Sequence, residues 1–274
     1  MYASFIKLEH TVFSLPLIVA GALVAARGWP GGHRLWFIML AAAAGRVMAM
    51  SLNRIIDAEI DARNPRTQSR ELARGVMARW EAWLITAIAG LLYVGSAAAL
   101  SPVCLWLSPV PVALFVLYPY LKRFTMLSHL GLGLAWSMAP LGGWLAVSGS
   151  LAQFYEIAWL WCFSWLWVAG FDIIYATLDE AFDRQEGLHS LPARLGRGKA
   201  LVIARILHAG AFAALAALWT TQLGGALSFV ALLGVGLLFV WQHAVAEQRP
   251  EFAFFQLNAV LGFAIFGLVL AGIR

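Results

Sequence analysis

Three polar residues recur at four-residue intervals where an apolar stretch of the chain ends. They are Asn53, Asp57 and Asp61. Residues four apart lie on nearly the same face of a helix, because each residue turns the helix by about 100°. The spacing therefore predicts one helix that presents an amide and two carboxylates along one side, with Asn53 deepest in the membrane.

A second acidic stretch lies much later in the chain, again at the end of an apolar run. Its acids are Asp172, Asp179 and Asp183, at spacings of seven and four. These spacings also predict carboxylates stacked on one helical face. Tyr175 lies about one turn before Asp179.

These carboxylates suit a site for a metal ion and a diphosphate. Ionised acids beside a bilayer are costly and usually face a wet cavity or a partner. Oxygen ligands without His or Cys favour a hard cation such as Mg²⁺, which binds through one or two carboxylates plus substrate phosphates. The basic residues available for the remaining phosphate oxygens are Arg63, Arg66, Lys122 and Arg123.

The simpler alternative is that the acids are solvated helix ends paired with loop arginines. One such acid alone would favour that interpretation. Two acidic motifs at matching helix ends favour the metal–phosphate site, because charge this close to a membrane is expensive.

The elements that must position these residues are membrane-spanning helices. Of the 274 residues, 62% are hydrophobic and 12% charged, and the mean hydropathy is +0.78. Soluble domains carry about 25% charged residues, so a water-soluble enzyme and a disordered chain are both excluded. We predict one all-α polytopic membrane domain, residues 1–274, with nine transmembrane helices around a central cavity. The nine apolar runs are 11–27, 34–56, 81–100, 102–121, 129–149, 154–175, 200–219, 223–243 and 252–272.

Positive charge predicts the orientation of these helices. The connections after the second, fourth and sixth runs carry Lys and Arg, whereas those after the third, fifth and seventh carry none. The positive-inside rule then places the N-terminus and the active-site loops on the cytoplasmic side of the inner membrane. The net charge of +5 accordingly reflects loop orientation and not nucleic-acid binding.

The two acidic motifs resemble those of the UbiA superfamily of intramembrane aromatic prenyltransferases. The family's first motif is NDxxDxxxD, and residues 53–61 read NRIIDAEID. The second motif resembles DIIYATLDEAFD at residues 172–183, and a third signature is the Tyr-Pro-x-x-Lys-Arg that ends at Arg123. Arg54 departs from the pattern, since the family has an acid there, so no role is carried over to that position.

The resemblance implies Mg²⁺-dependent transfer of a polyprenyl group from an allylic prenyl diphosphate to an aromatic acceptor. It implies that the catalytic and metal-binding residues are Asp57, Asp61, Asp179 and Asp183. The substrate-binding residues that it implies are Asn53, Arg63, Arg66, Tyr118, Lys122, Arg123, Asp172, Tyr175 and Arg194. Glu59 and Glu180 point away from these faces and are left out.

Arg46 lies seven residues before Asn53 and therefore on the same helical face. An arginine inside a membrane helix is a candidate functional residue, either binding an acceptor carboxylate or neutralising the acids. The partners that we expect are a prenyl diphosphate, an aromatic carboxylate and the lipid bilayer, with no protein partner indicated.

The motifs look most like those of 4-hydroxybenzoate polyprenyltransferases of respiratory quinone synthesis. Residues 64–67 and 186–190 also resemble a branch linked to menaquinone, whose acceptor is 1,4-dihydroxy-6-naphthoate. Both acceptors are phenolic carboxylates, so residue chemistry does not separate them. A different alternative is an ion-coupled transporter, which would place the acids near the bilayer midplane.

Overall fold

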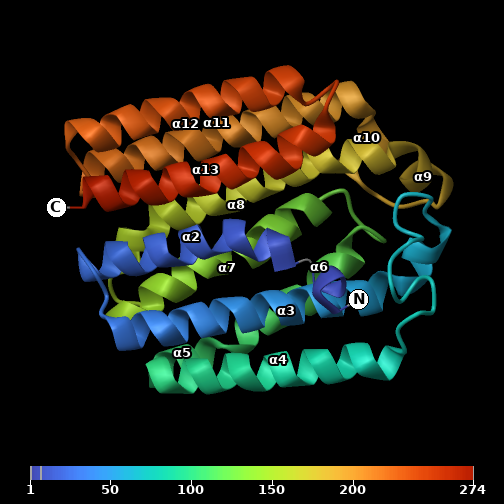
Figure 1. The fold of residues 1–274 in the computed structure, drawn as a ribbon. Helices are drawn as coiled ribbons and strands as arrows, with labels where there is room; N and C mark the ends of the chain where they lie inside the picture. The colour runs from blue at the N-terminus through green and yellow to red at the C-terminus, as the bar shows by residue number, and fades with distance from the viewer. Residues whose placement is uncertain (1, 7, 274) are drawn as a thin grey trace.

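The chain folds into a bundle of long helices, shown by a computed structural model that describes residues 2–6 and 8–273 (Figure 1). Side chains are described except at residues 3 and 8–14. Within the described residues there is no β-strand, so the all-α prediction is confirmed. The helices are α1 (Tyr2–Phe5), α2 (Leu8–Ala26), α3 (Gly32–Arg63), α4 (Arg79–Leu100), α5 (Pro102–Leu107), α6 (Pro109–Leu121), α7 (Ser128–Ser148), α8 (Tyr155–Ala176), the 3₁₀ turn η1 (Thr177–Asp179), α9 (Glu180–Gln185), α10 (Leu191–Leu195), α11 (Arg197–Gln222), α12 (Ala226–Val245) and α13 (Pro250–Gly272).

The predicted membrane spans correspond closely to these helices. In the part of the chain that is described, eight helical segments are long and apolar enough to cross a membrane, and they match the second to ninth predicted runs. The first run falls in α2, whose apolar part is the shorter Leu15–Ala26. The multi-pass architecture is confirmed, and the total of nine spans stays a prediction.

Proline and serine shape the fourth span. Pro102 occupies the first turn of α5, and the Ser101 side chain caps that helix by accepting from the backbone N–H of Cys104 at 3.1 Å. Pro109 then begins α6 directly after Ser108. Because proline has no N–H to donate to the preceding turn, the run predicted as one helix is divided at Ser108.

The two acidic motifs differ in their backbone. α3 continues past its apolar run to Arg63, so Asn53, Asp57 and Asp61 do share one helix, as predicted. α8 instead ends at Ala176 and passes through η1 into α9. The predicted stack of the second motif on one helical face is therefore wrong, because a 3₁₀ turn with three residues per turn changes the register.

The length of α3 explains how it positions its acids. Its 32 residues extend about 48 Å, against a bilayer core of about 30 Å. The helix can therefore cross the apolar layer and still project by several turns. Asp57 and Asp61 lie in that last part, at the same end of the bundle as the loop 64–78, α9 and α10 (Figure 1).

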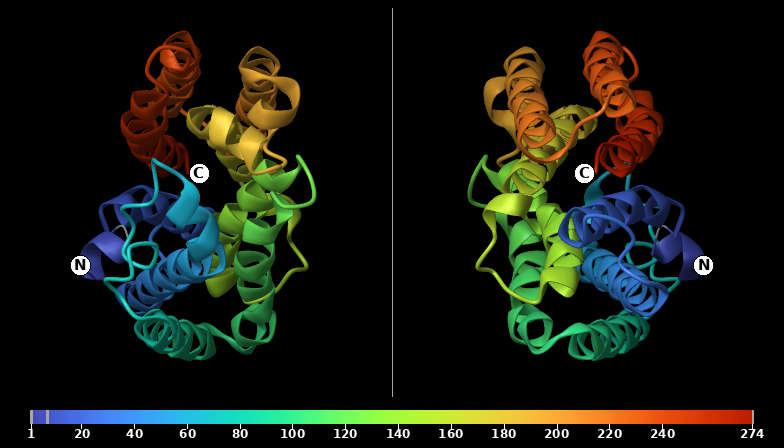
Figure 2. Two further views of the ribbon diagram at one scale, coloured as in Figure 1. Left: turned by 90° about the vertical axis from the view of Figure 1, so that its right-hand side faces the viewer. Right: turned by 90° about the vertical axis from the view of Figure 1, so that its left-hand side faces the viewer.

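Seen along the helices, the bundle has two lobes (Figure 2). The first part of the chain, through α7, forms the larger lobe, and α11, α12 and α13 form the smaller one. α8 packs against both α7 and α11, and α2 packs against both α7 and α13. The first acidic motif thus comes from the larger lobe, and the second follows α8, the helix that packs against both lobes.

Glycines permit the close contact of α2 with α7. A Cβ added at Gly143 would overlap the backbone oxygen of Ile18, and one added at Gly21 would overlap that of Pro140. Small residues at helix contacts let membrane helices approach closely and gain dispersion energy. The glycines therefore let α2 and α7 pack backbone against backbone.

Gly143→Ala should therefore lower the melting temperature of the detergent-solubilised protein, because overpacking of this kind costs about 1–3 kcal/mol. The matched control is Gly142→Ala, since no heavy atom of the described residues lies within 4 Å of a Cβ at Gly142. That variant should melt at or slightly above the temperature of the parent protein, because alanine favours helix over glycine. Equal melting temperatures for the two variants would contradict the assigned contact.

Candidate active site

A large cavity opens among the helices beneath the acidic motifs. Its volume is about 900 Å³, and its lining combines charged residues from both motifs with apolar side chains from α3, α6, α7 and α13. Most of the predicted site residues line it, namely Arg46, Asn53, Asp57, Asp61, Arg66, Tyr118, Lys122, Asp172, Tyr175, Asp179 and Asp183. The fold therefore brings the two motifs to one space.

Asp57 is the most enclosed acid of the first motif, with 3% of its surface exposed. Its Oδ2 accepts from Lys122 Nζ at 2.7 Å and from the Asn53 amide at 3.2 Å. Its buried Oδ1 has no hydrogen-bond donor among the described residues, and the Arg123 guanidinium lies 3.6 Å from it. This oxygen therefore has an ion-pair partner in Arg123 but accepts no hydrogen bond from the described residues.

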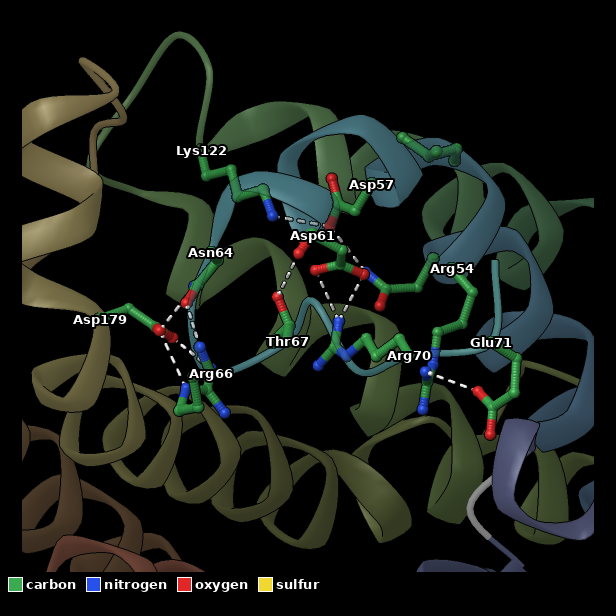
Figure 3. A network of polar contacts seen from close by, with 12 residues as sticks. Arg54, Asp57, Asp61, Asn64, Arg66, Thr67, Arg70, Glu71, Lys122 and Asp179 are labelled. Atoms are coloured by element: carbon green, nitrogen blue, oxygen red, sulfur yellow. Dashed lines mark hydrogen bonds and ion pairs between the residues drawn. The ribbon is translucent and has the colours of Figure 1, made fainter. Parts of the chain in front are cut away.

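Asp61, one turn further along α3, is held by the loop that follows the helix (Figure 3). Arg70 Nη1 donates to both carboxylate oxygens, at 2.8 and 2.7 Å. The Thr67 hydroxyl donates to the backbone oxygen of Asp61 at 3.2 Å. The loop 64–78 therefore folds back over the end of α3 and neutralises this acid.

The same loop reaches the second motif. Arg66 Nε donates to Asp179 Oδ1 at 2.9 Å, its Nη2 donates to the other oxygen, and the Asn64 amide donates to Oδ1 at 2.8 Å (Figure 3). Arg66 also donates to the Tyr175 hydroxyl at 2.5 Å and lies over its ring at 4.6 Å. This contact joins the end of α3 to the end of α8.

The charge of Arg66 is secured by these contacts. Burial alone would lower the pKa of Arg66, but its hydrogen bonds to Asp179 and Tyr175 outweigh burial and raise that pKa above its ordinary value. The two-nitrogen contact with a carboxylate is a geometry that lysine does not reproduce. Arg66 consequently keeps its positive charge where it contacts Asp179.

His129 is a site residue that sequence reasoning missed. Its side chain is 4% exposed, lines the cavity, and places Nδ1 2.7 Å from Asp172 Oδ2. The backbone N–H of Leu191 donates to its Nε2 at 3.2 Å. A lone histidine at the start of an apolar helix carried no signal of this pairing, because Asp172 lies 43 positions away. Asn64 was missed for the same reason.

Arg46 lies deeper in the cavity than the acids. Its guanidinium carbon is 4.9 Å from the centre of the Trp136 ring, and its buried Nε has no hydrogen-bond partner among the described residues. Eleven residues of helix separate it from Asp57, or about 16 Å. Neutralisation of the first-motif acids by Arg46 is therefore excluded, and the other predicted role, binding an acceptor carboxylate, remains.

Three predicted site residues lie outside the cavity lining of the described chain. Arg63 is exposed and pairs with Glu186 at 2.8 Å, and Arg194 is exposed on α10. Arg123 donates to the backbone oxygen of Ile56 at 2.8 Å and contacts the cavity only through Asp57. The structure therefore gives no support to direct diphosphate binding by Arg63 or Arg194.

The acids that the prediction left out do point away. Glu59 pairs with Arg79 at 3.3 Å, with side chains 79% and 66% exposed. Glu180 pairs with Arg184 at 2.9 Å on the surface of α9. The division of the acidic residues into cavity and surface sets follows the helical faces.

Arg54, the departure from the family pattern, is buried and turned toward the N-terminus (Figure 3). Its Nη1 lies 3.3 Å from Glu71 Oε2, while the Ser4 hydroxyl donates to Oε1 of the same glutamate at 2.6 Å. Its guanidinium carbon is 5.9 Å from the centre of the Phe5 ring. Arg54 thus connects α3 to α1 and to the loop that carries Arg66 and Arg70.

The four motif acids do not converge on one point. In the described residues no group of three or more His, Cys, Asp or Glu side chains is placed to hold one metal ion. Each of three acids instead contacts its own base, Asp57 with Lys122, Asp61 with Arg70, and Asp179 with Arg66. The pairing of acids with loop arginines, which the simpler alternative predicted, is thus present, but the paired acids line a cavity.

Comparison with known proteins decides the family. The model of the UbiA prenyltransferase family matches residues 14–271 of the chain. The chain belongs to the UbiA prenyltransferase family. It is therefore a membrane-embedded prenyltransferase. The alternative of an ion-coupled transporter is set aside, because that alternative predicts acids near the bilayer midplane and the motif acids of this chain lie at helix ends.

Relatives in this family cover nearly the whole chain. A protein of Shewanella sediminis (strain HAW-EB3) called 4-hydroxybenzoate octaprenyltransferase is 27% identical, over 97% of this chain and 94% of its own length. The apo structure of a UbiA homolog from Aeropyrum pernix K1 has a TM-score of 0.87 and 35% identity, covering 94% of this chain and 95% of that one. A UbiA homolog from Archaeoglobus fulgidus bound to GPP and Mg²⁺ shares the fold, with a TM-score of 0.70 and 17% identity over 98% of this chain and 99% of that one.

Arg54→Ala should destabilise this prenyltransferase. The change removes the ion pair with Glu71 and leaves polar groups unsatisfied, at a cost of about 1–3 kcal/mol. The measurement is the melting temperature in detergent, with Arg79→Ala as the matched control because its pair with Glu59 is exposed and contributes about 0–1 kcal/mol. A drop confined to Arg79→Ala, or equal drops in both variants, would refute this role for Arg54.

Proposed function

We propose that this protein transfers a polyprenyl group from an allylic prenyl diphosphate to 4-hydroxybenzoate. The observation that carries the proposal is the cavity, which joins a highly charged end to an apolar interior that contains Arg46. A lipid diphosphate has the same division between a charged head and an apolar chain. The name of the Shewanella relatives supports 4-hydroxybenzoate as the acceptor.

The charged end suits the diphosphate and Mg²⁺. Each Mg²⁺ needs only one or two carboxylates plus phosphate oxygens, and Asp57 Oδ1 accepts no hydrogen bond from the described residues. Asp57 and Asp61 would hold one ion, and Asp179 and Asp183 would hold another. Bound Mg²⁺ would supply positive charge that stabilises the leaving diphosphate.

The basic residues beside these acids would complete the diphosphate site. Lys122 and Arg66 both line the cavity and contact motif carboxylates. As phosphate oxygens approach, these side chains can donate hydrogen bonds to them while the carboxylates turn toward the metal. They would thereby stabilise the negative charge that collects on the diphosphate as it leaves.

An aromatic wall follows the charged end inward. Tyr175 stacks on Phe254 with ring centres 4.1 Å apart, Phe254 meets Phe171 edge-on at 5.3 Å, and Phe171 meets Trp136 at 6.1 Å. All four rings line the cavity. Such π faces stabilise a cation without offering a nucleophile, as an allylic carbocation requires.

Two tryptophans of α8 pack against neighbouring helices instead. Trp167 is buried and donates to Asn258 at 3.0 Å, and Trp165 donates to the backbone oxygen of Leu130 at 2.9 Å. Neither lines the cavity in the described chain. Both side chains therefore serve contacts between helices.

The reaction then proceeds as follows. The allylic carbon–oxygen bond breaks, and its electron pair leaves on the diphosphate. A ring carbon ortho to the acceptor hydroxyl forms the new carbon–carbon bond, and transfer of the proton on that carbon to the released diphosphate restores the aromatic ring. Asp172, on the cavity wall near the end of α8, would accept a hydrogen bond from the acceptor hydroxyl and make the ring more electron-rich.

Arg46 would bind the acceptor carboxylate at the other end of the ring. Arg54, Arg66 and Arg70 also line the cavity, but each of them pairs with a carboxylate. Among the described residues Arg46 contacts the ring of Trp136 and pairs with no carboxylate. Tyr118 also lines the cavity. This arrangement suits a flat acceptor with a carboxylate and a hydroxyl at opposite ends.

We also propose that the charged end faces the cytoplasm. The connections at that end contain Arg66, Arg70, Arg74, Lys122 and Arg123, which the positive-inside rule places in the cytoplasm. Water-soluble acceptors and diphosphate heads would then enter from the cytoplasmic side of the inner membrane.

The deciding experiment is an acceptor screen with protein purified in detergent, Mg²⁺ and geranyl diphosphate. 4-Hydroxybenzoate and 1,4-dihydroxy-6-naphthoate are offered separately, and prenylated product is detected by mass spectrometry. We expect 4-hydroxybenzoate to give a product that carries the geranyl group. If only the naphthoate gave product, 1,4-dihydroxy-6-naphthoate would be the acceptor and not 4-hydroxybenzoate. If folded protein gave product with neither compound, the proposal would be refuted. In the same assay Arg46→Ala should raise the KM of the acceptor far more than that of geranyl diphosphate.

Metal removal provides a separate prediction. EDTA should stop product formation and added Mg²⁺ should restore it, because the diphosphate leaves only when its charge is neutralised. Asp57→Asn should require a higher Mg²⁺ concentration for half-maximal rate, since one oxygen ligand is lost. Glu59→Gln is the matched control on the same helix and should leave the Mg²⁺ dependence unchanged. Turnover that is insensitive to EDTA would contradict the metal site.

A further inference from the structure

A short segment between α9 and α10 crosses the charged end of the bundle. We call residues 186–191 the strap. Glu186 accepts from Arg63 Nε at 2.8 Å, the backbone N–H of His189 donates to the backbone oxygen of Lys122 at 2.7 Å, and the backbone N–H of Leu191 donates to His129 Nε2 at 3.2 Å. The strap is thus attached to the ends of α3, α6 and α7.

The strap is also part of the cavity wall. Leu188 and Ser190 are buried and line the cavity. The segment therefore closes the space between the second motif and the connection that carries Lys122. Its attachment to α7 differs from the other two, because it runs through an imidazole that also contacts a cavity carboxylate.

The two contacts of His129 set its hydrogen positions. Since the Leu191 N–H donates to Nε2, that nitrogen must be the acceptor, and a neutral imidazole then carries its hydrogen on Nδ1. Nδ1 lies 2.7 Å from Asp172 Oδ2 and donates to it. Seating of the strap and orientation of Asp172 are therefore linked through one buried ring.

We infer that His129 is a positioning residue that couples the closed strap to the orientation of Asp172. The inference rests on the proposed function, in which Asp172 contacts the acceptor hydroxyl. No other hydrogen bond to Asp172 comes from the residues that the structure describes. The histidine thus holds one oxygen of a carboxylate that lines the cavity, and the other oxygen accepts no hydrogen bond from the described residues.

If His129 were purely structural, its two contacts would affect only stability. Substitution can remove the two contacts one at a time, because the amide group of Asn reaches about the position of Nδ1 and that of Gln about the position of Nε2. His129→Asn keeps a donor for Asp172 and loses the strap contact. His129→Gln keeps an acceptor for the Leu191 N–H and loses the donor to Asp172.

The test compares both variants in the acceptor assay and in hydrogen–deuterium exchange of the strap. His129→Gln should lower kcat about 10- to 100-fold, the range expected when a hydrogen bond to a charged group is lost. The KM for geranyl diphosphate and the protection of residues 186–191 should stay near those of the parent protein. His129→Asn should recover most of kcat while the strap exchanges faster.

Controls separate the possible outcomes. His33→Gln, at the exposed start of α3, should leave both readouts unchanged, and melting temperatures exclude unfolded variants. Equal kcat in the Gln and Asn variants, or unchanged kcat in His129→Gln, would overturn the inference while the parent's turnover still upholds the proposed function. Absence of turnover in the folded parent would refute the proposed function itself, and the exchange data alone would then report whether the Leu191 contact exists.

Discussion

The contact between Arg66 and Asp179 is the interaction on which the rest of the site depends. It pairs a residue just beyond α3 with a residue just beyond α8, and so links these two helices at their charged ends. Without a base between them, acids from two motifs would repel one another in surroundings where charge is weakly screened. The loop 64–78 supplies that base, and it supplies Arg70 to Asp61 from the same backbone.

Placement of this loop in turn depends on contacts outside the cavity. Arg54 and Ser4 both contact Glu71, directly after Arg70 in the chain. A residue that departs from the family motif is therefore used to fasten the loop that neutralises the motif. Since buried ionic groups are destabilising when unpaired, the arrangement couples stability of the α1–α3 region to the charge balance of the site.

From the charged end inward, the cavity changes in steps that match the parts of a prenyl-transfer reaction. Carboxylates and bases come first, then the rings of Tyr175, Phe254 and Phe171, and apolar side chains further in. The charged groups are suited to the leaving diphosphate, the rings to the developing cation, and the apolar part to the chain. Asp172 and Arg46 are polar groups set within this inner region, and for that reason they are suited to the acceptor.

Composition and spacing alone determined the membrane class and the helix runs, and they indicated which acids share a helical face. These properties are local: apolar runs of sufficient length must span the bilayer, and residues four apart must share a helical face, which is why Asp57 and Glu59 were assigned to opposite sides correctly. Only the tertiary structure decided which partners meet. The pairs Arg66–Asp179 and His129–Asp172 join residues 113 and 43 positions apart. Arg63 and Arg194 looked equivalent to Arg66 in the sequence, yet they face outward, because helix direction and loop path, and not charge, set where a side chain points.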